Sequence, residues 1–317
     1  QPGFPGANLN LGRLLAILKQ PDEALKHLQE ALSSLPDSAL GHFLLGKVLS
    51  DMGFTPEAVN QVQQALKLKP EDQDMASMML FTMNYLPNYP VEKLFAAHLD
   101  YAHRFCGELY PKNPQYINSP DPERPLKVGY VSGDFRGHPV SQFVEFLFTH
   151  HDRNYFKVYG FYNYHSNDGV TERLRRLVDI WHPIFTQKDD PMADLIRALG
   201  IDILVDLSGH TEHHRLTVFA RKPAPVQATW LGYLGTTGLA TMDYRIGDIY
   251  TDPPGLTERF HTEKLARLPD SQWCYAPYVD LSPVGELPLL RKGHLTLGSF
   301  NNPSKLNDRV LELWAKV

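Results

Sequence analysis

The chain has 317 residues, enough for about two domains, and its 43% apolar and 21% charged residues are typical of a globular protein and exclude a disordered one. A net charge of −5 disfavours nucleic acid as the main partner. Two cysteines, Cys106 and Cys274, exclude a disulfide framework and a four-thiolate zinc site, and they indicate a reducing, cytoplasmic setting. The sequence predicts no membrane partner and no signal peptide, because no apolar run reaches the ~18 residues of a membrane span.

The first seventy residues repeat with a period of 34: Leu11-Gly12 returns as Leu45-Gly46, and Pro36 as Pro70. This is the length and pattern of tetratricopeptide repeats, which pair antiparallel helices. Such helices form either a concave surface for a protein or peptide or a packing scaffold for the rest of the chain. We expect repeats over 1–75, with more of them preceding the chain.

A helical transition and a proline-rich linker are expected over 76–123. The stretches Met75–Met83 and Val91–Leu109 read as helices, and Ser119-Pro-Asp-Pro-Glu-Arg-Pro125 is dense in proline.

The texture then changes to alternating strands and helices, which predicts a doubly wound parallel sheet over 124–292. Expected strands are 126–132, 156–162, 203–207, 226–231 and 244–249, and expected helices are 140–150, 171–180 and 192–199. The fold class is thus α/β with an all-α N-terminal part. Ligands of such sheets bind beyond the carboxyl ends of the strands.

Three of the loops after strands attract attention. In Ser132–Pro139, Asp134 and His138 either act on a hydroxyl or a sugar, or merely cap and close the loop. In Leu207–Arg215, His210 with two further histidines invites a metal interpretation, but a strand-end histidine beside a helix start is favoured. The turn Trp230–Gly238 is rich in glycine, which lets a ligand approach the backbone.

In 293–317, at the end of the chain, the sequence pattern predicts the first strand, loop and helix of a second α/β lobe whose remainder is absent. Leu295–Phe300 reads as a strand, the loop after it holds Asn302 and Lys305, and a helix begins at Asp308. Lys305 is either a cation for a diphosphate or an ordinary surface lysine.

These loops, in this order and behind helical repeats, resemble the O-GlcNAc transferase family. The matching segments begin at Val128 (VGYVSGDF, then His138-Pro139), Arg221 (RKPAPVQ, then WLGY), Gly235 (GTTG, then MDY), Glu263 (EKL, then Leu-Pro) and Ser299 (SFNN, then Lys305). The resemblance implies repeats followed by two Rossmann-like lobes (GT-B), with the incomplete second lobe binding the nucleotide. It also implies inverting transfer of a sugar from a nucleotide diphosphate to Ser or Thr of proteins, without a metal or another cofactor.

Carried over residue by residue, the resemblance implies that Asp134 is a proton acceptor or relay and that Lys305 and Asn302 contact the nucleotide diphosphate. Catalytic roles fall to Asp134, His138 and Lys305. The sugar and acceptor pocket would be lined by six residues: His138, Pro139, His210, Leu231, Gly232 and Leu234. Protein or peptide acceptors would be recruited through the repeats, in the cytoplasm or, in a eukaryote, the nucleus.

Two departures from the family limit the resemblance. The first is that a histidine carried by well-known members before the catalytic region has no counterpart in Met75-Ala-Ser-Met-Met-Leu-Phe81. The second is that most of the nucleotide lobe is missing, so we expect this chain alone to be inactive. In the pocket turn, Leu234 stands where the family often has proline.

The donor and the class of function leave alternatives. UDP-GlcNAc is favoured, whereas Ser208–Thr211, Thr236–Leu239 and Asp252–Gly255 are closer to the SPINDLY branch, whose members are protein O-fucosyltransferases that use GDP-fucose. A non-catalytic repeat adaptor and a small-molecule glycosyltransferase are the other interpretations. Retention of Asp134, His138 and Lys305 together argues against an adaptor.

Overall fold

A computed structural model describes residues 4–275, 277 and 282–317. The chain divides into two compact units, which are described separately. One comprises Gln1–Met75, Thr82–Asn88 and Pro277–Val317, and the other comprises Ala76–Phe81 and Tyr89–Ala276. None of the helices among the described residues is long and apolar enough to cross a membrane.

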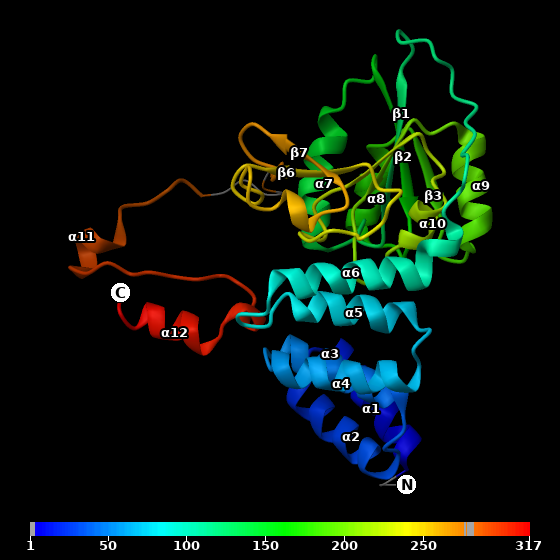
Figure 1. Cartoon of the computed structure of the whole chain (residues 1–317). Coiled ribbons are helices and arrows are strands. Elements are labelled where there is room, and N and C mark those ends of the chain that lie inside the picture. Colours follow the sequence, from blue (N-terminus) through cyan, green and yellow to red (C-terminus); the bar gives the residue numbers. More distant parts are fainter. Residues whose placement is uncertain (1–3, 276, 278–281) are drawn as a thin grey trace. The chain divides into compact units, whose positions relative to one another are not determined.

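The N-terminal helices repeat as the 34-residue period predicts. They are α1 (Pro5–Ile17), α2 (Pro21–Ser34), α3 (Ala39–Asp51) and α4 (Thr55–Leu68) (Figure 1). Glycine recurs where the two helices of a pair touch, since a Cβ on Gly12 would lie 2.6 Å from Leu28 Cγ and one on Gly46 would lie 2.7 Å from Val62 Cγ2. The repeated small residue therefore permits the same close packing in both pairs.

The two expected helices after the repeats are confirmed as α5 (Gln73–Met83) and α6 (Val91–Cys106), with a 3₁₀ turn η1 (Gly107–Leu109). On α6, the residues His98, Tyr101, Ala102 and Cys106 are buried. They occupy positions i, i+3, i+4 and i+8, which lie on one face of the helix, and this face packs inward.

Seven parallel strands form the predicted doubly wound sheet (Figure 1). They are β1 (Leu126–Ser132), β2 (Phe156–Tyr162), β3 (Ile180–Pro183), β4 (Ile203–Asp206), β5 (Val226–Thr229), β6 (Tyr244–Asp248) and β7 (Lys264–Leu268). Their order is β3-β2-β1-β4-β5-β6-β7. The chain thus extends outward from β1 in one direction and returns to β4 on the other side.

Helices cover both faces of this sheet, because the crossovers reverse direction between β3 and β4. They are α7 (Pro139–His150), α8 (Gly169–Arg176), α9 (Asp189–Leu199) and α10 (Leu216–Ala220). Val144 and Phe148 of α7 and Leu174 of α8 pack with Val128 and Val205 of the sheet in one apolar core. Right-handed crossovers assign α9 and α10 to the opposite face.

Two elements differ from the sequence prediction. The helix expected over 171–180 ends at Arg176, and Ile180 instead opens β3, a four-residue strand at the sheet edge. The strand expected over 295–300 is wrong: these residues have no regular structure and pair with no strand among the described residues. A strand depends on a neighbour for its backbone hydrogen bonds, and no strand of the described part of the chain pairs with 295–300.

The helix expected from Asp308 is confirmed as α12 (Asp308–Trp314). Two short elements precede it, α11 (Pro288–Lys292) and η3 (Pro303–Lys305).

Candidate functional site

The candidate site lies in the loops at the carboxyl edge of the sheet. β1 has β2 on one side and β4 on the other, so the connections after β1 and β4 leave in opposite directions. This reversal is the place where open α/β sheets bind ligands. The loops after β1, β4 and β5 carry the histidines, the carboxylate and the glycine-rich turn that the sequence singles out.

Asp134 and His138 are brought together in the loop after β1, as their spacing predicts. The Asp134 Oδ2 and His138 Nδ1 atoms are 3.6 Å apart. Asp134 is 5% exposed, and its Oδ1 accepts a hydrogen bond from Arg136 Nη2 at 3.2 Å. Arg136 in turn lies over the ring of Tyr164, 4.4 Å from its centroid. The carboxylate is therefore sheltered from bulk water and paired with a cation.

His138 occupies the N-cap of α7, where its extended backbone precedes Pro139, the first residue of the helix. Its Nδ1 accepts from the backbone N–H of Val140 at 3.3 Å. Desolvation lowers the pKa of His138, opposed by Asp134. The ring is therefore neutral at pH 7, with Nδ1 as acceptor and Nε2 carrying the proton. When a proton is taken up, Nδ1–H can turn to Asp134 instead.

The loop after β4 places His210 in the interior. It is 1% exposed, its Nε2 donates to the carbonyl of Thr237 at 3.0 Å, and its Nδ1 lies 3.2 Å from Ser77 Oγ. Burial lowers the pKa of His210 well below its usual value. Both ring nitrogens of His210 are engaged, and the side chain is buried. His210 therefore supports the loop from inside and does not line the surface of a pocket.

The loop after β5 holds Leu231 in a strained conformation. Leu231 has a φ of 73°, and the N–H of Gly232 donates to the carbonyl of Trp230 at 2.9 Å. A three-residue turn with a hydrogen bond between its first and third residues and a positive φ at the central residue is the rare form of the γ-turn. A non-glycine residue at its centre carries about 1–3 kcal/mol of backbone strain. A Cβ on Gly232 would lie 2.0 Å from the carbonyl oxygen of Leu207, so only glycine allows the two loops to touch.

Leu234 lies in the same loop and is 50% exposed. Its carbonyl accepts from Nε of the buried Arg245 at 3.2 Å, while the neighbouring Tyr233 hydroxyl lies 2.7 Å from His98 Nε2 on α6. Because His98 Nδ1 must donate to the Leu94 carbonyl, the hydroxyl of Tyr233 donates to Nε2. The turn thus exposes one apolar side chain, Leu234, while contacts with Arg245 and His98 fix its backbone and the neighbouring Tyr233.

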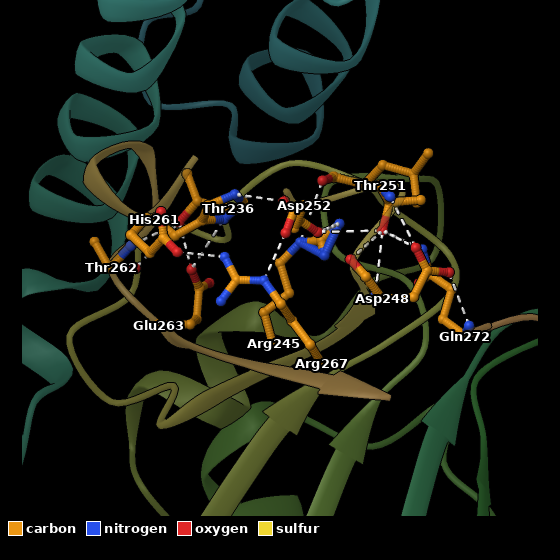
Figure 2. Close-up of polar contacts among 12 residues, drawn as sticks. Thr236, Arg245, Asp248, Thr251, Asp252, His261, Thr262, Glu263, Arg267 and Gln272 are labelled. Atoms are coloured by element: carbon orange, nitrogen blue, oxygen red, sulfur yellow. Dashed lines mark hydrogen bonds and ion pairs between the residues drawn. The ribbon is translucent and has the colours of Figure 1, made fainter. Parts of the chain in front are cut away.

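The sequence pattern assigns no role to Glu263, although this residue begins a recognised motif. Its carboxylate is buried and accepts from Thr236 Oγ1 at 2.6 Å and from the Thr237 backbone N–H at 2.7 Å. Figure 2 shows Glu263 facing Thr236 beside Arg245 and His261. The available signal was a glutamate directly before a strand, but its partners lie 26 and 27 residues earlier.

Asp252 is another carboxylate of the cluster drawn in Figure 2, which also contains Asp248. It pairs with Arg245 Nη2 at 3.1 Å and with His261 Nε2 at 3.3 Å. Desolvation would raise the pKa of Asp252, but the hydrogen bond and charge of its partners hold it below its usual value. Paired buried charges of this kind fix the loop between β6 and β7.

Asn302 and Lys305 belong to the other compact unit. Asn302 Oδ1 accepts from the backbone N–H of Ser304 at 3.0 Å, and the backbone N–H of Lys305 donates to the Asn302 carbonyl at 3.0 Å. The Lys305 side chain is exposed. Asn302 thus directly precedes the short 3₁₀ turn η3, which ends at Lys305, and the lysine side chain is open to solvent.

The metal interpretation of the histidine loop finds no support in the geometry. Among the described residues, no group of three or more His, Cys, Asp or Glu side chains could hold a metal ion. His210 and His214 are joined through Ser77, a hydroxyl that takes the place between them.

Known proteins are similar to this chain in sequence. The model of glycosyl transferase family 41 matches residues 109–275. The chain is 41% identical over 256 residues to a protein of Solanum lycopersicum named probable UDP-N-acetylglucosamine–peptide N-acetylglucosaminyltransferase SPINDLY, covering 80% of this chain and 27% of that one. It is 42% identical over 255 residues to the protein of the same name from Arabidopsis thaliana, covering 79% of this chain and 28% of that one. The chain therefore spans about a quarter of the length of these relatives.

A solved structure extends the comparison to the fold. A mutant of the O-GlcNAc transferase of Thermobaculum terrenum superimposes with a TM-score of 0.91 at 37% identity, covering 99% of this chain and 59% of that one. The matched family segment contains β1 to β7 and the loops that carry Asp134, His138 and Glu263. With more than half of its residues matched, this chain belongs to glycosyl transferase family 41.

Proposed function

We propose that this chain is part of a protein O-glycosyltransferase, which moves a sugar with inversion from a nucleotide diphosphate to Ser or Thr hydroxyls of proteins. The observation that carries the proposal is the pair formed by Asp134 and His138 at the carboxyl edge of β1, in the segment matched by the family. A sheltered carboxylate beside a neutral imidazole can accept or relay the proton of an attacking hydroxyl.

The transfer forms a bond between the hydroxyl oxygen and the anomeric carbon while the bond from that carbon to the diphosphate oxygen breaks. Asp134 takes up the proton, directly or through a water. The electron pair of the broken bond leaves with the diphosphate, whose developing charge Lys305 stabilises. Inversion requires attack from the side opposite to the leaving group, so the acceptor base and the diphosphate cation are proposed to act on opposite sides of the anomeric carbon.

His138 is proposed to bind the sugar or the acceptor through its Nε2–H, since Nδ1 is engaged by the Val140 N–H. Pro139, Leu231, Gly232 and Leu234 are proposed to line the pocket beside it. His210 contributes indirectly, through the Thr237 carbonyl. Asn302 is proposed to bind the nucleotide beside Lys305.

UDP-GlcNAc is the donor we propose, because the names of the plant relatives specify it for those proteins. GDP-fucose is the alternative. The helical repeats are proposed to recruit the protein acceptors. Cys106 and Cys274 are both free thiols, which supports a reducing compartment such as the cytoplasm.

The decisive experiment incubates the complete protein with radiolabelled UDP-GlcNAc or GDP-fucose and a mixture of acceptor proteins. Incorporation from one donor, lost in Asp134→Asn and kept in Asp194→Asn, would support the proposal and identify the sugar. Asp194 is a suitable control because its side chain is 75% exposed on α9. No transfer from either donor would overturn the proposal and favour a non-catalytic adaptor.

A further inference from the structure

Ser77 joins two buried histidines of the loop after β4. Its Oγ lies 2.9 Å from His214 Nε2 and 3.2 Å from His210 Nδ1. Ser77 is 2% exposed and comes from α5, more than 130 residues earlier in the sequence than the histidines. A single hydroxyl therefore connects a helix that precedes the sheet to a loop at the sheet's carboxyl edge.

The proton positions in this cluster follow from one fixed acceptor. The Thr237 carbonyl can only accept, so His210 Nε2 carries a proton and donates to it. The neutral His210 ring then offers a lone pair at Nδ1, to which Ser77 Oγ–H donates. The Ser77 oxygen is left to accept from Nε2–H of the second histidine, His214.

The last step of the chain agrees with this assignment. His214 Nδ1 accepts from the backbone N–H of Leu216 at 3.4 Å, which requires a lone pair at Nδ1 and the proton at Nε2. All four hydrogen bonds therefore run in one direction, from Leu216 to Thr237. Because the series ends on a carbonyl that cannot pass a proton on, it fixes positions and does not conduct protons.

Thr237 is the residue on which this series acts. It is fully buried, and its N–H and hydroxyl both donate to Glu263 while its carbonyl accepts from His210. The same turn contains Leu231 and Leu234, which we have proposed to line the pocket. Losing the His210 contact would release one side of a turn that already stores strain at Leu231.

We propose that Ser77 is a positioning residue, which acts through His210 on the Thr237 carbonyl to hold the turn 231–238 in its working conformation. The kinetic part of this inference depends on the proposed glycosyl transfer. The structural part does not, because the hydrogen-bond directions predict ring tautomers that can be observed in the chain without any substrate.

The first test is ¹⁵N NMR of the histidine rings, assigned with single His→Gln variants. We expect His210 and His214 as Nε2–H tautomers and His98 as the less common Nδ1–H tautomer. In Ser77→Ala the ¹⁵N chemical shift of His210 Nδ1 should move toward that of a non-protonated ring nitrogen that accepts no hydrogen bond. A His210 ring protonated at Nδ1 would overturn the proposal, whether or not the protein transfers sugar.

The second test measures transfer by the complete protein. Ser77→Ala should lower kcat about tenfold or more, the scale expected when a group that orients a reacting site is misplaced, and Ser77→Thr should restore part of it. Ser50→Ala is the matched control, since Ser50 is also a buried helical serine, 6% exposed on α3. A folded Ser77→Ala protein with normal kcat would refute the positioning role. If the unaltered protein transfers neither sugar, the proposed function fails and the NMR result alone decides the role of Ser77.

Discussion

Thr237 is held by Glu263 at two atoms, because the same Oε1 of Glu263 accepts from the Thr237 N–H at 2.7 Å and from its hydroxyl at 2.5 Å. The other carboxylate oxygen accepts from Thr236 Oγ1 at 2.6 Å. One buried carboxylate thus closes the glycine-rich turn after β5. The turn's conformation depends on a strand that begins after two further crossovers of the chain.

Glu263→Gln should destabilise the protein by about 3 kcal/mol, since hydrogen bonds to a charged group are lost and Arg245 loses a nearby buried counter-charge. Urea unfolding followed by circular dichroism measures this change. Glu92→Gln, at an exposed position in the first turn of α6, should alter the unfolding midpoint little. A Glu263→Gln protein as stable as the unaltered chain would show that the turn is held by other contacts.

Asp134→Asn and His138→Ala should lower the transfer rate by ~10²–10⁴-fold, the usual contribution of a positioned acid–base group, and leave nucleotide affinity almost unchanged. The reason is that both side chains belong to the loop after β1, which we assign to the acceptor hydroxyl and the sugar. Turnover and calorimetric binding of UDP or GDP, measured on the same complete proteins, test the assignment. A large loss of affinity with a normal maximal rate would move this loop to the donor side.

Lys305→Ala should reduce turnover by roughly 10²–10³-fold without unfolding the protein, because a cation that stabilises a leaving diphosphate acts in the transition state. Lys316→Ala is the matched control, as another exposed lysine in the same unit. The comparison is made by transfer kinetics together with thermal unfolding of both variants. Equal activity of the two variants would reduce Lys305 to a surface residue.

Asp206 should make the protein lose relative stability as the pH rises. Burial raises its pKa to about 6 from 3.8, against the donors Thr229, Gly209 and Ser208. A carboxyl with a raised folded-state pKa costs stability above that pKa, and the cost disappears as the pH falls through 6 toward 3.8. Relative to Asp206→Asn, the unaltered chain should lose up to about 3 kcal/mol between pH 4 and 7. Parallel stability curves for the two proteins would contradict this.

His98 should have the opposite pH dependence. Burial lowers its pKa to about 4 from 6.5, so the folded state binds fewer protons than the unfolded state between these values. The neutral His98 ring costs the folded state nothing above pH 6.5, and the free energy of unfolding decreases as the pH falls from 6.5 toward 4. His98→Gln should therefore remove up to about 3 kcal/mol of the acid-induced destabilisation in chemical unfolding at pH 4.5 and 7.5. An unchanged difference between the two pH values would exclude His98 as a source of acid sensitivity.

The sequence predicted those parts of the fold whose pattern is local. A repeated glycine at Gly12 and Gly46 and β-rich runs such as 126–132 need no knowledge of distant residues. The edge strand β3 escaped prediction because its four residues, from Ile180 to Pro183, carry too short a pattern. The strand expected over 295–300 failed for the converse reason, since an apolar run becomes a strand only beside a partner.

The site was predictable to the same extent. Asp134 and His138 meet because they are four residues apart in one loop, which the sequence displays. The inward orientation of His210 and the role of Ser77 depend on contacts between segments 133 residues apart. Neither a spacing rule nor a single-residue preference reports such contacts, so buried hydroxyls and carboxylates that fix a turn require the three-dimensional structure.

The contact of Gly12 with Leu28 and that of Gly46 with Val62 are the same contact, displaced by one helix pair. A chain built in this way can gain or lose a whole pair while every remaining interface keeps its form. The reach of the N-terminal part can therefore change in steps of one helix pair while the loops at the carboxyl edge of the sheet keep their geometry. Among related proteins, we expect the range of acceptors to vary with the number of helix pairs and the chemistry of transfer to remain constant.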